Sequence, residues 1–401
     1  MSLLLHPDYL ANETPSDRGT FTAEEIERQP LTWKKLWKKI MQESERLTSF
    51  VNNLQTKRGL NIVLTGAGSS AFVGDTVASS WLTHTSCPTQ VIPTTDLVTH
   101  FRERVATTKP LLLISFARSG NSPESTAAIQ RANELCEEVH HLIITCNAEG
   151  KLAQMKGQPN TCVFLLPPEA EDQSLAMTNS FTSMALAATL IPALSAVPTD
   201  KLQGQVETLS SYAEHLLGQY VPMLHTIAQK AFSRIVFLGS GSNWGVAKES
   251  HLKVQELTNG QVVGKFDSFL GFRHGPKAII NDETLIVYLL SNDKRTNRYE
   301  RDLIDQVARH DIDLTTVAVA ETSDITSNVD FSIQMGENHK LREEFWAILC
   351  TLPAQIIGFF KSLMLGYNPD NPSPDGTISR VVEGVTIYND TPKSVNRQQQ
   401  L

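Results

Sequence analysis

Three short segments of this 401-residue chain carry side chains that could do chemistry. The first is Ser119-Gly-Asn-Ser122-Pro, which lies where an apolar strand-like run passes into a predicted helix. Main-chain N–H groups at such a junction, together with the hydroxyls of Ser119 and Ser122, are suited to an anion. Asn121 or Ser122 could instead serve only as a helix cap. Two serines, a glycine and Arg118 exceed what a cap needs, so we interpret this loop as a phosphate-binding site.

The second segment is a predicted helix over residues 243–259, with Glu249, Lys253 and Glu256 at i, i+4 and i+7 and hence on one face. Glutamate before lysine at this spacing is typical of a solvated surface ion pair, and spacing alone favours that interpretation. The third segment, Gly271-Phe-Arg-His274-Gly-Pro276, is turn-prone and presents a histidine that would titrate near neutrality. From the residues alone, acid/base chemistry at either place is a hypothesis.

A glycine-rich turn, Gly66-Ala-Gly68-Ser-Ser-Ala71, follows an apolar run and matches the dinucleotide-binding fingerprint. The acidic residue expected about 20 positions later is missing, since Asp96 stands about 30 beyond Gly66. A second copy, Gly239-Ser-Gly241, favours a structural strand-to-helix turn over NAD(P) binding. Such a turn can also present Ser69 and Ser70 to a ligand.

The glycine-rich turn is one part of a longer repeat, in which segments of the first half recur in the second half. Gly66 and Gly239 are 173 residues apart, and two later pairs of apolar runs are 174 residues apart, which indicates a duplicated domain. Near-continuous apolar strands that alternate with helices predict two doubly wound, flavodoxin-like α/β sandwiches with parallel sheets. The expected parts are an N-terminal arm with helices (1–59), a first domain that binds phosphate (60–198), a connector helix with a second domain that carries the acid/base residues (199–366), and an extended tail (367–401). The tail contains one strand-like run, RVVEGVTIY, at 380–388.

Several helices are predicted outside the repeats. A capping box at Thr22-Ala-Glu-Glu25 predicts a short helix that Pro30 ends, and a longer helix is expected over 32–55. Its WKKLWKKI stretch is interpreted as a packing face rather than a membrane helix, because acidic residues follow at once. Apolar helices are expected to close the two domains at 177–196 and 343–365.

The composition excludes several classes of function. A net charge of −8 gives no field for nucleic acid or an anionic membrane, so an anionic ligand must be captured locally. Five cysteines without CxxC spacing fit reduced thiols and a cytoplasmic location. We expect no export signal, no membrane span, no metal site and no cofactor.

At the segments described above, the chain resembles the sugar isomerase (SIS) family, in particular the isomerase half of glucosamine-6-phosphate synthase. The resemblance covers about residues 50 to 395. The family's phosphate loop, Ser-Gln-Ser-Gly-Glu-Thr, falls on Ala117-Arg-Ser-Gly-Asn-Ser122, and its Gly-Thr-Ser segment falls on Gly68-Ser-Ser70. Its catalytic helix falls on 249–256, its Lys-His-Gly-Pro on 273–276 and its Lys-Ser-Val on 393–395. Ala117 and Asn121 depart from the family's serine and glutamate, and the synthase's glutaminase has no counterpart in this sequence.

Closer still is the AgaS-type branch of galactosamine-6-phosphate deaminase/isomerases, which segments such as TGAGSSAF, PTTDLVT and PDNPSPDGTISRVVEGV resemble. The resemblance implies release of ammonia and tagatose 6-phosphate from galactosamine 6-phosphate, with no cofactor and in a homodimer or larger homo-oligomer whose neighbouring subunit supplies the histidine. The implied site consists of Glu256 as acid/base, His274 for ring opening, Lys393 or Lys253 beside the enediol, Ser69 on the substrate, and Ser70, Arg118, Ser119, Gly120, Asn121 and Ser122 on the phosphate.

Two other functions stay open. The same residues could isomerise tagatose 6-phosphate without deamination, and the fold also serves sugar-phosphate sensors that lack catalysis. A sensor needs the phosphate loop but no placed base, so Glu256 and His274 together favour an enzyme.

Overall fold

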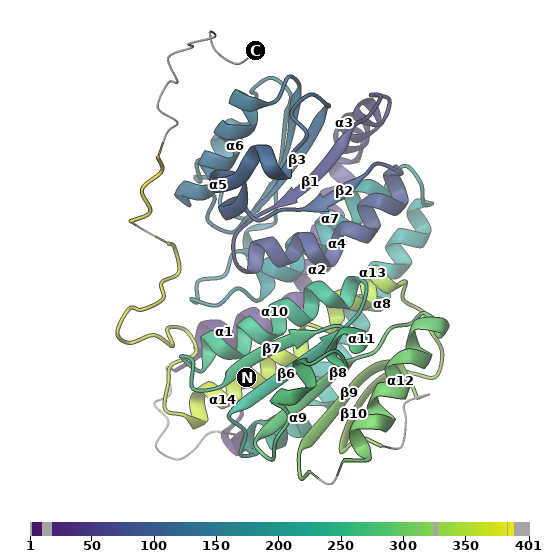
Figure 1. Cartoon of the computed structure of the whole chain (residues 1–401), viewed down its shortest axis with the longest axis vertical. Coiled ribbons are helices and arrows are strands. Elements are labelled where there is room, and N and C mark those ends of the chain that lie inside the picture. The colour runs from purple at the N-terminus through teal and green to yellow at the C-terminus, as the bar shows by residue number, and fades with distance from the viewer. Residues whose placement is uncertain (1, 10–17, 311, 324–327, 383, 389–401) are drawn as a thin grey trace, which may run out of the picture.

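The structure is a computed structural model that describes residues 2–9, 18–310, 312–323, 328–382 and 384–388. In these ranges the chain forms two parallel five-stranded sheets, one above the other in Figure 1, each flanked by helices. The expected fold class is therefore confirmed. Both sheets have the same connectivity, because the first strand of each pairs with the second on one side and with the third on the other.

The first sheet has the order β2-β1-β3-β4-β5. Its strands are β1 (Asn61–Thr65), β2 (Thr89–Val91), β3 (Leu111–Ala117), β4 (Val139–Thr145) and β5 (Thr161–Leu165). Helices α5 (Thr94–Arg104) and α6 (Pro123–Leu135) contribute to the core on one face, and α4 (Ser69–Thr85) and α7 (Asn179–Ala193) to the core on the other. Every residue of β3 is buried as a result, which explains its uninterrupted apolar sequence.

The second sheet has the order β10-β9-β8-β6-β7. Its strands are β6 (Arg234–Gly239), β7 (Val263–Asp267), β8 (Thr284–Leu289), β9 (Thr315–Thr322) and β10 (Phe331–Gly336). Its helices are α10 (Ser242–Leu257), α11 (Phe269–Phe272), α12 (Lys294–Ala308), α13 (Glu343–Leu349) and α14 (Leu352–Met364). In both sheets the strand order reverses beside the first strand, and ligands of such folds bind at the carboxyl ends of the strands at this point.

The two domains meet where α4 packs against α10. A Cβ on Gly245 of α10 would lie 2.3 Å from the main-chain nitrogen of Thr76 in α4, so only glycine permits this close crossing. The Oγ atoms of Ser79 and Ser242 are 2.9 Å apart across the same contact. This crossing sets the start of α4 against the end of α10, where the candidate residues of the two domains stand.

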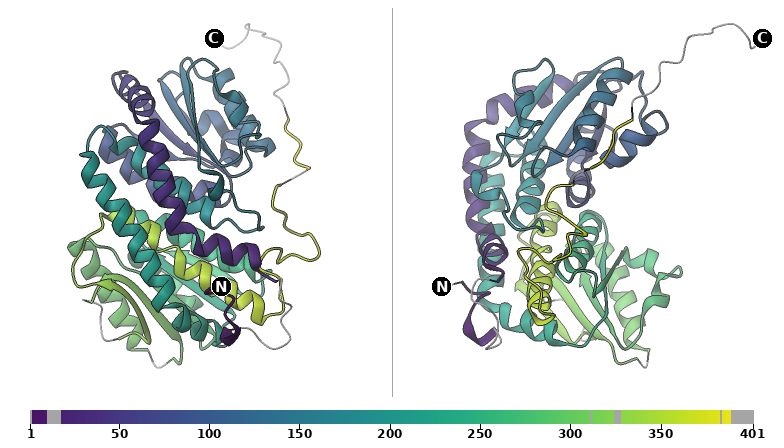
Figure 2. Two further views of the ribbon diagram at one scale, coloured as in Figure 1. Left: turned by 180° about the vertical axis from the view of Figure 1, so that it is seen from behind. Right: turned by 90° about the vertical axis from the view of Figure 1, so that its left-hand side faces the viewer.

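Helices from the N-terminus and the connector cross the back of both sheets, as the left view of Figure 2 shows. They are α1 (Thr20–Glu27), α2 (Gln29–Gln42), α3 (Ser44–Gln55), α8 (Thr199–Gln219) and α9 (Val221–Gln229). Short 3-10 turns are formed by Pro7–Tyr9, Ala153–Met155, Pro168–Ala170 and Pro276–Ile279. Trp33 and Ile40 are fully buried, which confirms that the WKKLWKKI stretch is a packing face.

Some expectations about local structure were wrong. Glu25 does not form a capping box with Thr22, because α1 already begins at Thr20 and the Glu25 carboxylate accepts hydrogen bonds from the amides of Gln173 and Ser174. The helix expected over 32–55 breaks at Glu43, and the closing helix over 343–365 breaks after Leu349. The strand-like run at 380–388 forms no strand in its described residues, and β7 was not predicted.

Taken together, α13, α14 and the turn between them (Glu343–Met364) are, among the described residues, the one stretch long and apolar enough to cross a membrane. Its most apolar window is 89% buried inside the fold. It therefore has the environment of a core helix, packed against α9 and α10.

Candidate active site

The loop after β3 surrounds a cavity of about 110 Å³ at the point where the strand order of the first sheet reverses. Ser70, Ser119, Gly120 and Ser122 line it, and residues 380–382 of the C-terminal segment form another wall. Within the described part of the chain, the main-chain amides of Ser119, Gly120 and Ser122 have no hydrogen-bond acceptor. Unpaired amides beside serine hydroxyls, at the start of a helix, form an anion-binding arrangement.

Close packing holds this loop in shape. Gly120 has a φ of 65°, and a Cβ on Gly150 would lie 2.4 Å from the carbonyl oxygen of Ser119, so both positions require glycine. The Asn121 side chain is also fixed, because its Oδ1 accepts a hydrogen bond from the Lys151 amide at 3.1 Å. Asn121 does not itself line the cavity, so its contact with phosphate stays a prediction.

Ser122 both caps α6 and lines the cavity. Its Oγ accepts a hydrogen bond from the Ser125 amide at 3.3 Å and lies 2.6 Å from the Ser125 hydroxyl. The capping role considered for this serine is therefore real, and it leaves the Ser122 amide unpaired in the cavity.

Arg118 lies beside the loop but points its guanidinium at carbonyl oxygens. Nη1 donates to Ser174 and Leu175 at 3.1 and 2.9 Å, and Nη2 donates to Arg380 at 2.6 Å. The Arg118 side chain is 6% exposed. It thus holds the C-terminal segment against the cavity, while its contact with phosphate stays a prediction.

Lys253 of α10 joins three candidate residues. Its Nζ lies 3.1 Å from Glu249 Oε1, 2.8 Å from Glu256 Oε2 and 3.1 Å from the Oγ of Ser69 at the start of α4. Lys253 and Glu249 are each 1% exposed, so the solvated ion pair that spacing favoured is wrong. Glu256 keeps 23% of its side chain exposed and is the member of this group that a ligand can reach.

Burial perturbs the ionisation of this group. Burial raises the pKa of Glu249 to about 7, against the opposing charge of Lys253. Burial also disfavours the Lys253 ammonium, but the charges of Glu249 and Glu256 outweigh it and raise the pKa of Lys253 above its ordinary value. Lys253 therefore remains a cation that donates a hydrogen bond to Glu256 and forms an ion pair with Glu249. The hydrogen bond from Lys253 therefore fixes the orientation of the Glu256 carboxylate.

The glycine turn explains how Ser69 and Ser70 reach their places. A Cβ on Gly66 would lie 2.5 Å from the carbonyl carbon of Ser70, and Gly68 has a φ of 54°. The same geometry recurs at Gly239 and Gly241 in the second domain. The glycines thus make a tight turn in both domains, which directs Ser69 to Lys253 and Ser70 to the cavity.

The cavity and the carboxylate group share one electrostatic environment. Burial lowers the pKa of Arg118, and the negative charges of Asp172 and Glu256 oppose that shift. Glu256 is thus one of the negative charges near Arg118, which flanks the loop after β3.

His274 stands apart from this group. It is exposed, it follows α11, and its imidazole makes no hydrogen bond within the described ranges. Lys393 lies outside the described residues. Those residues also contain no cluster of three His, Cys, Asp or Glu side chains that could hold a metal ion.

The chain matches the SIS domain family over residues 55–192. It is 39% identical over 388 residues to the D-galactosamine-6-phosphate deaminase AgaS of Escherichia coli, which covers 94% of this chain and 98% of the relative. This chain belongs to the AgaS family of SIS-domain proteins.

Solved structures agree with this placement in the AgaS family. The tagatose-6-phosphate ketose/aldose isomerase of Escherichia coli superimposes with a TM-score of 0.84 at 36% identity, over 92% of this chain and 97% of the other. A Clostridium novyi protein assigned the same activity superimposes with a TM-score of 0.90 at 41% identity, over 95% and 97% of the two chains.

Sequence reasoning missed two parts of this AgaS-family site. Glu249 was recognised only as part of a motif, although it is the buried partner of Lys253. Arg380 was not singled out, although its guanidinium donates to the carbonyl oxygen of Asp172 and its own carbonyl accepts from Arg118. No local pattern marks Arg380, because its partners are more than 200 residues away.

Proposed function

We propose that this protein is an isomerising deaminase that converts galactosamine 6-phosphate to tagatose 6-phosphate and ammonia. The relationship to AgaS deaminases over almost the whole chain supports the substrate. The observation that carries the reaction is the position of Lys253, which contacts both Ser69, beside the phosphate cavity, and Glu256. A base and an anion site are thereby held together, as proton transfer on a phosphorylated sugar requires.

The phosphate dianion binds at the loop after β3. The amides of Ser119, Gly120 and Ser122 and the hydroxyls of Ser119 and Ser122 donate to it, and the Asn121 Nδ2 and the Ser70 hydroxyl complete the set. Each charge-assisted hydrogen bond of this kind contributes about 1.5–3 kcal/mol. Residues 380–382, held by Arg118, close the cavity over the bound end of the sugar. The reacting end then extends toward α10.

Proton transfer follows once the pyranose ring has opened. His274 moves the proton that opens the ring. Glu256 removes the proton from C2 of the open aldehyde while O1 takes up a proton from water, which gives an enaminol. Glu256 then returns its proton to C1 as the amino nitrogen loses a proton to water. The product is a C2 imine; water adds to C2, ammonia leaves, and a ketone remains. The Lys253 ammonium stabilises the negative charge that develops on O1, and Lys393 is a further candidate for that role.

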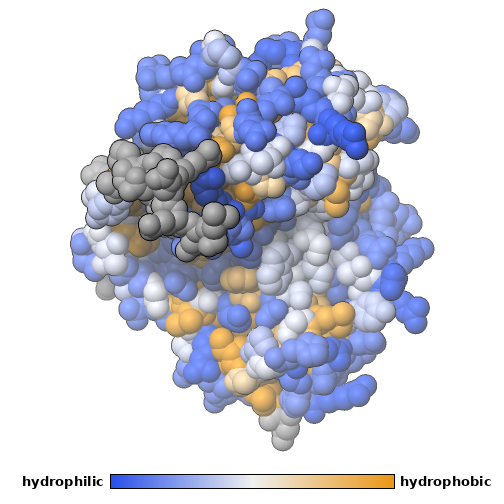
Figure 3. Space-filling view, turned by 45° about the horizontal axis from the view of Figure 1, so that its top comes forward, coloured by the Kyte–Doolittle hydropathy of each residue, from blue (hydrophilic) through white to orange (hydrophobic). Residues whose placement is uncertain are grey.

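A homodimer or larger homo-oligomer is part of this proposal. His274 is exposed and does not contact Glu256, so a neighbouring subunit's histidine would complete the site. Val263 and Leu270, in the same domain as His274, are 54% and 48% exposed. Apolar side chains also gather in the lower part of the face drawn in Figure 3, over the second domain. We place the enzyme in the cytoplasm, in the catabolism of phosphorylated amino sugars.

Ammonia release from a panel of hexosamine 6-phosphates tests the proposal. Galactosamine 6-phosphate is expected to react fastest, and the ketose product and ammonia should appear in equal amounts. The second candidate, isomerisation of tagatose 6-phosphate without deamination, rests on the activity assigned to the solved relatives. It predicts conversion of tagatose 6-phosphate to an aldose, with no ammonia from any member of the panel.

A further inference from the structure

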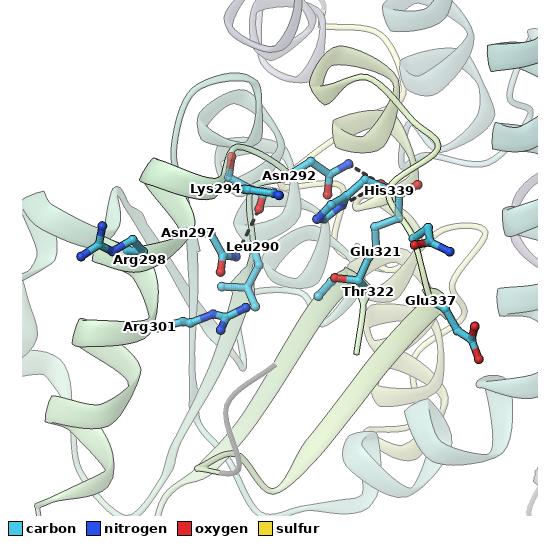
Figure 4. A pocket seen from close by; sticks show the side chains of 13 residues that line it. Leu290, Asn292, Lys294, Asn297, Arg298, Arg301, Glu321, Thr322, Glu337 and His339 are labelled. Carbon is cyan, nitrogen blue, oxygen red and sulfur yellow. Dashed lines mark hydrogen bonds and ion pairs between the residues drawn. The ribbon is translucent and has the colours of Figure 1, made fainter. Parts of the chain in front are cut away.

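The second domain contains a larger pocket that the proposed reaction does not use. Its volume is about 470 Å³, within the range of small-molecule sites. It is lined by residues at the carboxyl ends of β8, β9 and β10 and by the first turns of α12, as Figure 4 shows. It shares no lining residue with the cavity of the first domain.

Main-chain amides cannot hold an anion here as they can after β3. The Ser291 amide donates to Glu300 Oε2 and the Asn292 amide donates to Glu343 Oε2, both at 2.8 Å. The first turn of α12 is capped by the Asp293 carboxylate, which accepts from the Thr296 amide at 2.8 Å. Carboxylates of the chain itself therefore occupy the positions that a phosphate takes in the first domain.

In the second domain, the position beside β6 that corresponds to the cavity beside β1 is also filled. Asn243 of α10 donates through Nδ2 to the carbonyl oxygens of Leu289 and Leu290, at 3.2 and 3.4 Å. The pocket of the second domain therefore lies one strand further along its sheet than the cavity of the first domain does, at the ends of β8 and β9. An anion bound there has to be held by side chains.

Two cationic side chains are placed to do this. Lys294 and Arg301 of α12 extend toward the centre of the pocket, whereas Arg298 on the same helix points away from it (Figure 4). The Nε of Arg301 is buried and has no hydrogen-bond partner in the described ranges. Neither residue forms an ion pair with a described carboxylate. Their charges are thus available to a ligand.

The opposite wall carries groups that suit hydroxyls. Glu321, at the end of β9, holds His339 at 3.2 Å and the Asn292 Nδ2 at 2.5 Å, which fixes both side chains at the pocket edge. The Oδ1 of Asn292 is buried without a hydrogen-bond partner among the described residues. Asn297 and Thr322 add further amide and hydroxyl groups. Glu321 and Glu337 also bring carboxylates to this wall, and carboxylates accept hydrogen bonds from hydroxyls. Cations on one side, with carboxylate and amide groups on the other, match a phosphate joined to a polyol.

We propose that this pocket binds a second phosphorylated sugar, with its phosphate on Lys294 and Arg301 and its hydroxyls on the amide side chains of the opposite wall. The site is not catalytic, since Glu256 and Lys253 are absent from its lining.

Equilibrium binding of glucose 6-phosphate, counted per chain, tests this inference. The wild-type protein should bind two equivalents. Lys294→Gln with Arg301→Gln should leave one, whereas Ser119→Ala with Ser122→Ala should keep two equivalents and weaken one of them at least about tenfold. Arg295→Gln removes one charge from an exposed residue of the same helix outside the pocket, and this control should still bind two.

The outcomes separate the two sites. If the Ser119→Ala/Ser122→Ala protein binds no sugar phosphate, or the wild type binds one equivalent, the second site is refuted, and this result does not depend on the folding of the α12 variant. If instead neither of the two equivalents binds more weakly to the Ser119→Ala/Ser122→Ala protein than to the wild type, the proposed substrate site fails and this one stands. Inorganic phosphate should bind the second site at least tenfold more weakly than glucose 6-phosphate. Equal affinity would show a site for free phosphate and overturn the assignment to a sugar.

Discussion

The Nζ of Lys253, in the second domain, lies 3.1 Å from the Oγ of Ser69, in the first. Ser69 begins the helix whose next residue, Ser70, lines the cavity proposed to bind phosphate, and Lys253 also contacts Glu256. The candidate site is therefore built across the crossing of α4 and α10, and neither domain contains all of it. This arrangement leads to the following predictions.

The first prediction concerns the phosphate loop. Replacing Ser119 and Ser122 with alanine should raise KM at least about tenfold, because each hydroxyl that donates to a charged group contributes about 1.5 kcal/mol or more. Substrate without its 6-phosphate should react poorly with the wild type and be nearly indifferent to the double substitution.

The matched control for the loop variant is Ser291→Ala with Thr296→Ala, in the corresponding loop of the second domain. Carboxylates already occupy that loop, so KM should change little. Because Ser122 also caps α6, the melting temperature of each variant should be measured beside its kinetics. A larger KM effect from the second-domain pair would reverse the division of labour proposed for the two domains.

The second prediction concerns His274. His274→Asn should slow the cyclic sugar more than an open-chain analogue, because ring opening precedes proton transfer at C2. Steady-state kinetics with both substrates measures the difference. Equal deficits for the two would mean that His274 has no part in ring opening.

The third prediction concerns the buried charge of Lys253. Lys253→Met leaves Glu249 buried without its cation, which typically costs about 3–5 kcal/mol of unfolding free energy. Glu249→Gln combined with Lys253→Met should recover much of that loss, since no buried charge is then unpaired. Urea denaturation of the three proteins measures this. Equal stability of the single and double variants would contradict a buried ion pair.

The fourth prediction is a pH dependence. Burial raises the pKa of Glu249 from its ordinary value of 4.5 to about 7, so the folded protein binds this proton more tightly than the unfolded chain. The stability that Glu249 contributes is therefore highest below pH 4.5 and falls as the pH rises toward 7. The unfolding free energy of the wild type, minus that of Glu249→Gln, should decrease over this interval. A difference that increases would mean that the pKa shift has the opposite sign.

The sequence was sufficient for the parts of the fold that depend on local pattern. The strands β1, β3 and β4 were predicted because helices cover both faces and their apolar runs are nearly unbroken. Strand β7 was missed because it lies at a sheet edge and none of its residues is buried. The break at Glu43 was missed because the apolar spacing continues through it into α3.

The candidate site also has parts that the sequence predicted and parts that it did not. The loop at 119–122 and the turn at 66–71 were recognisable because both are short and contiguous. The burial of Lys253 was not, because glutamate and lysine at i, i+4 have the same spacing on a surface and in a domain interface. Arg118 was expected on the phosphate, yet two of its nitrogens donate to carbonyls of segments distant in sequence. Contacts of this kind depend on the tertiary fold.

The central claim is that Glu256 is the base of a deaminating isomerisation, and the rate of ammonia release by Glu256→Gln tests it most directly. The substitution keeps the shape and hydrogen-bonding reach of the side chain but removes the base. We predict that kcat for galactosamine 6-phosphate falls at least about 100-fold while the substrate dissociation constant is largely unchanged. Near-normal ammonia release by this variant would contradict the account.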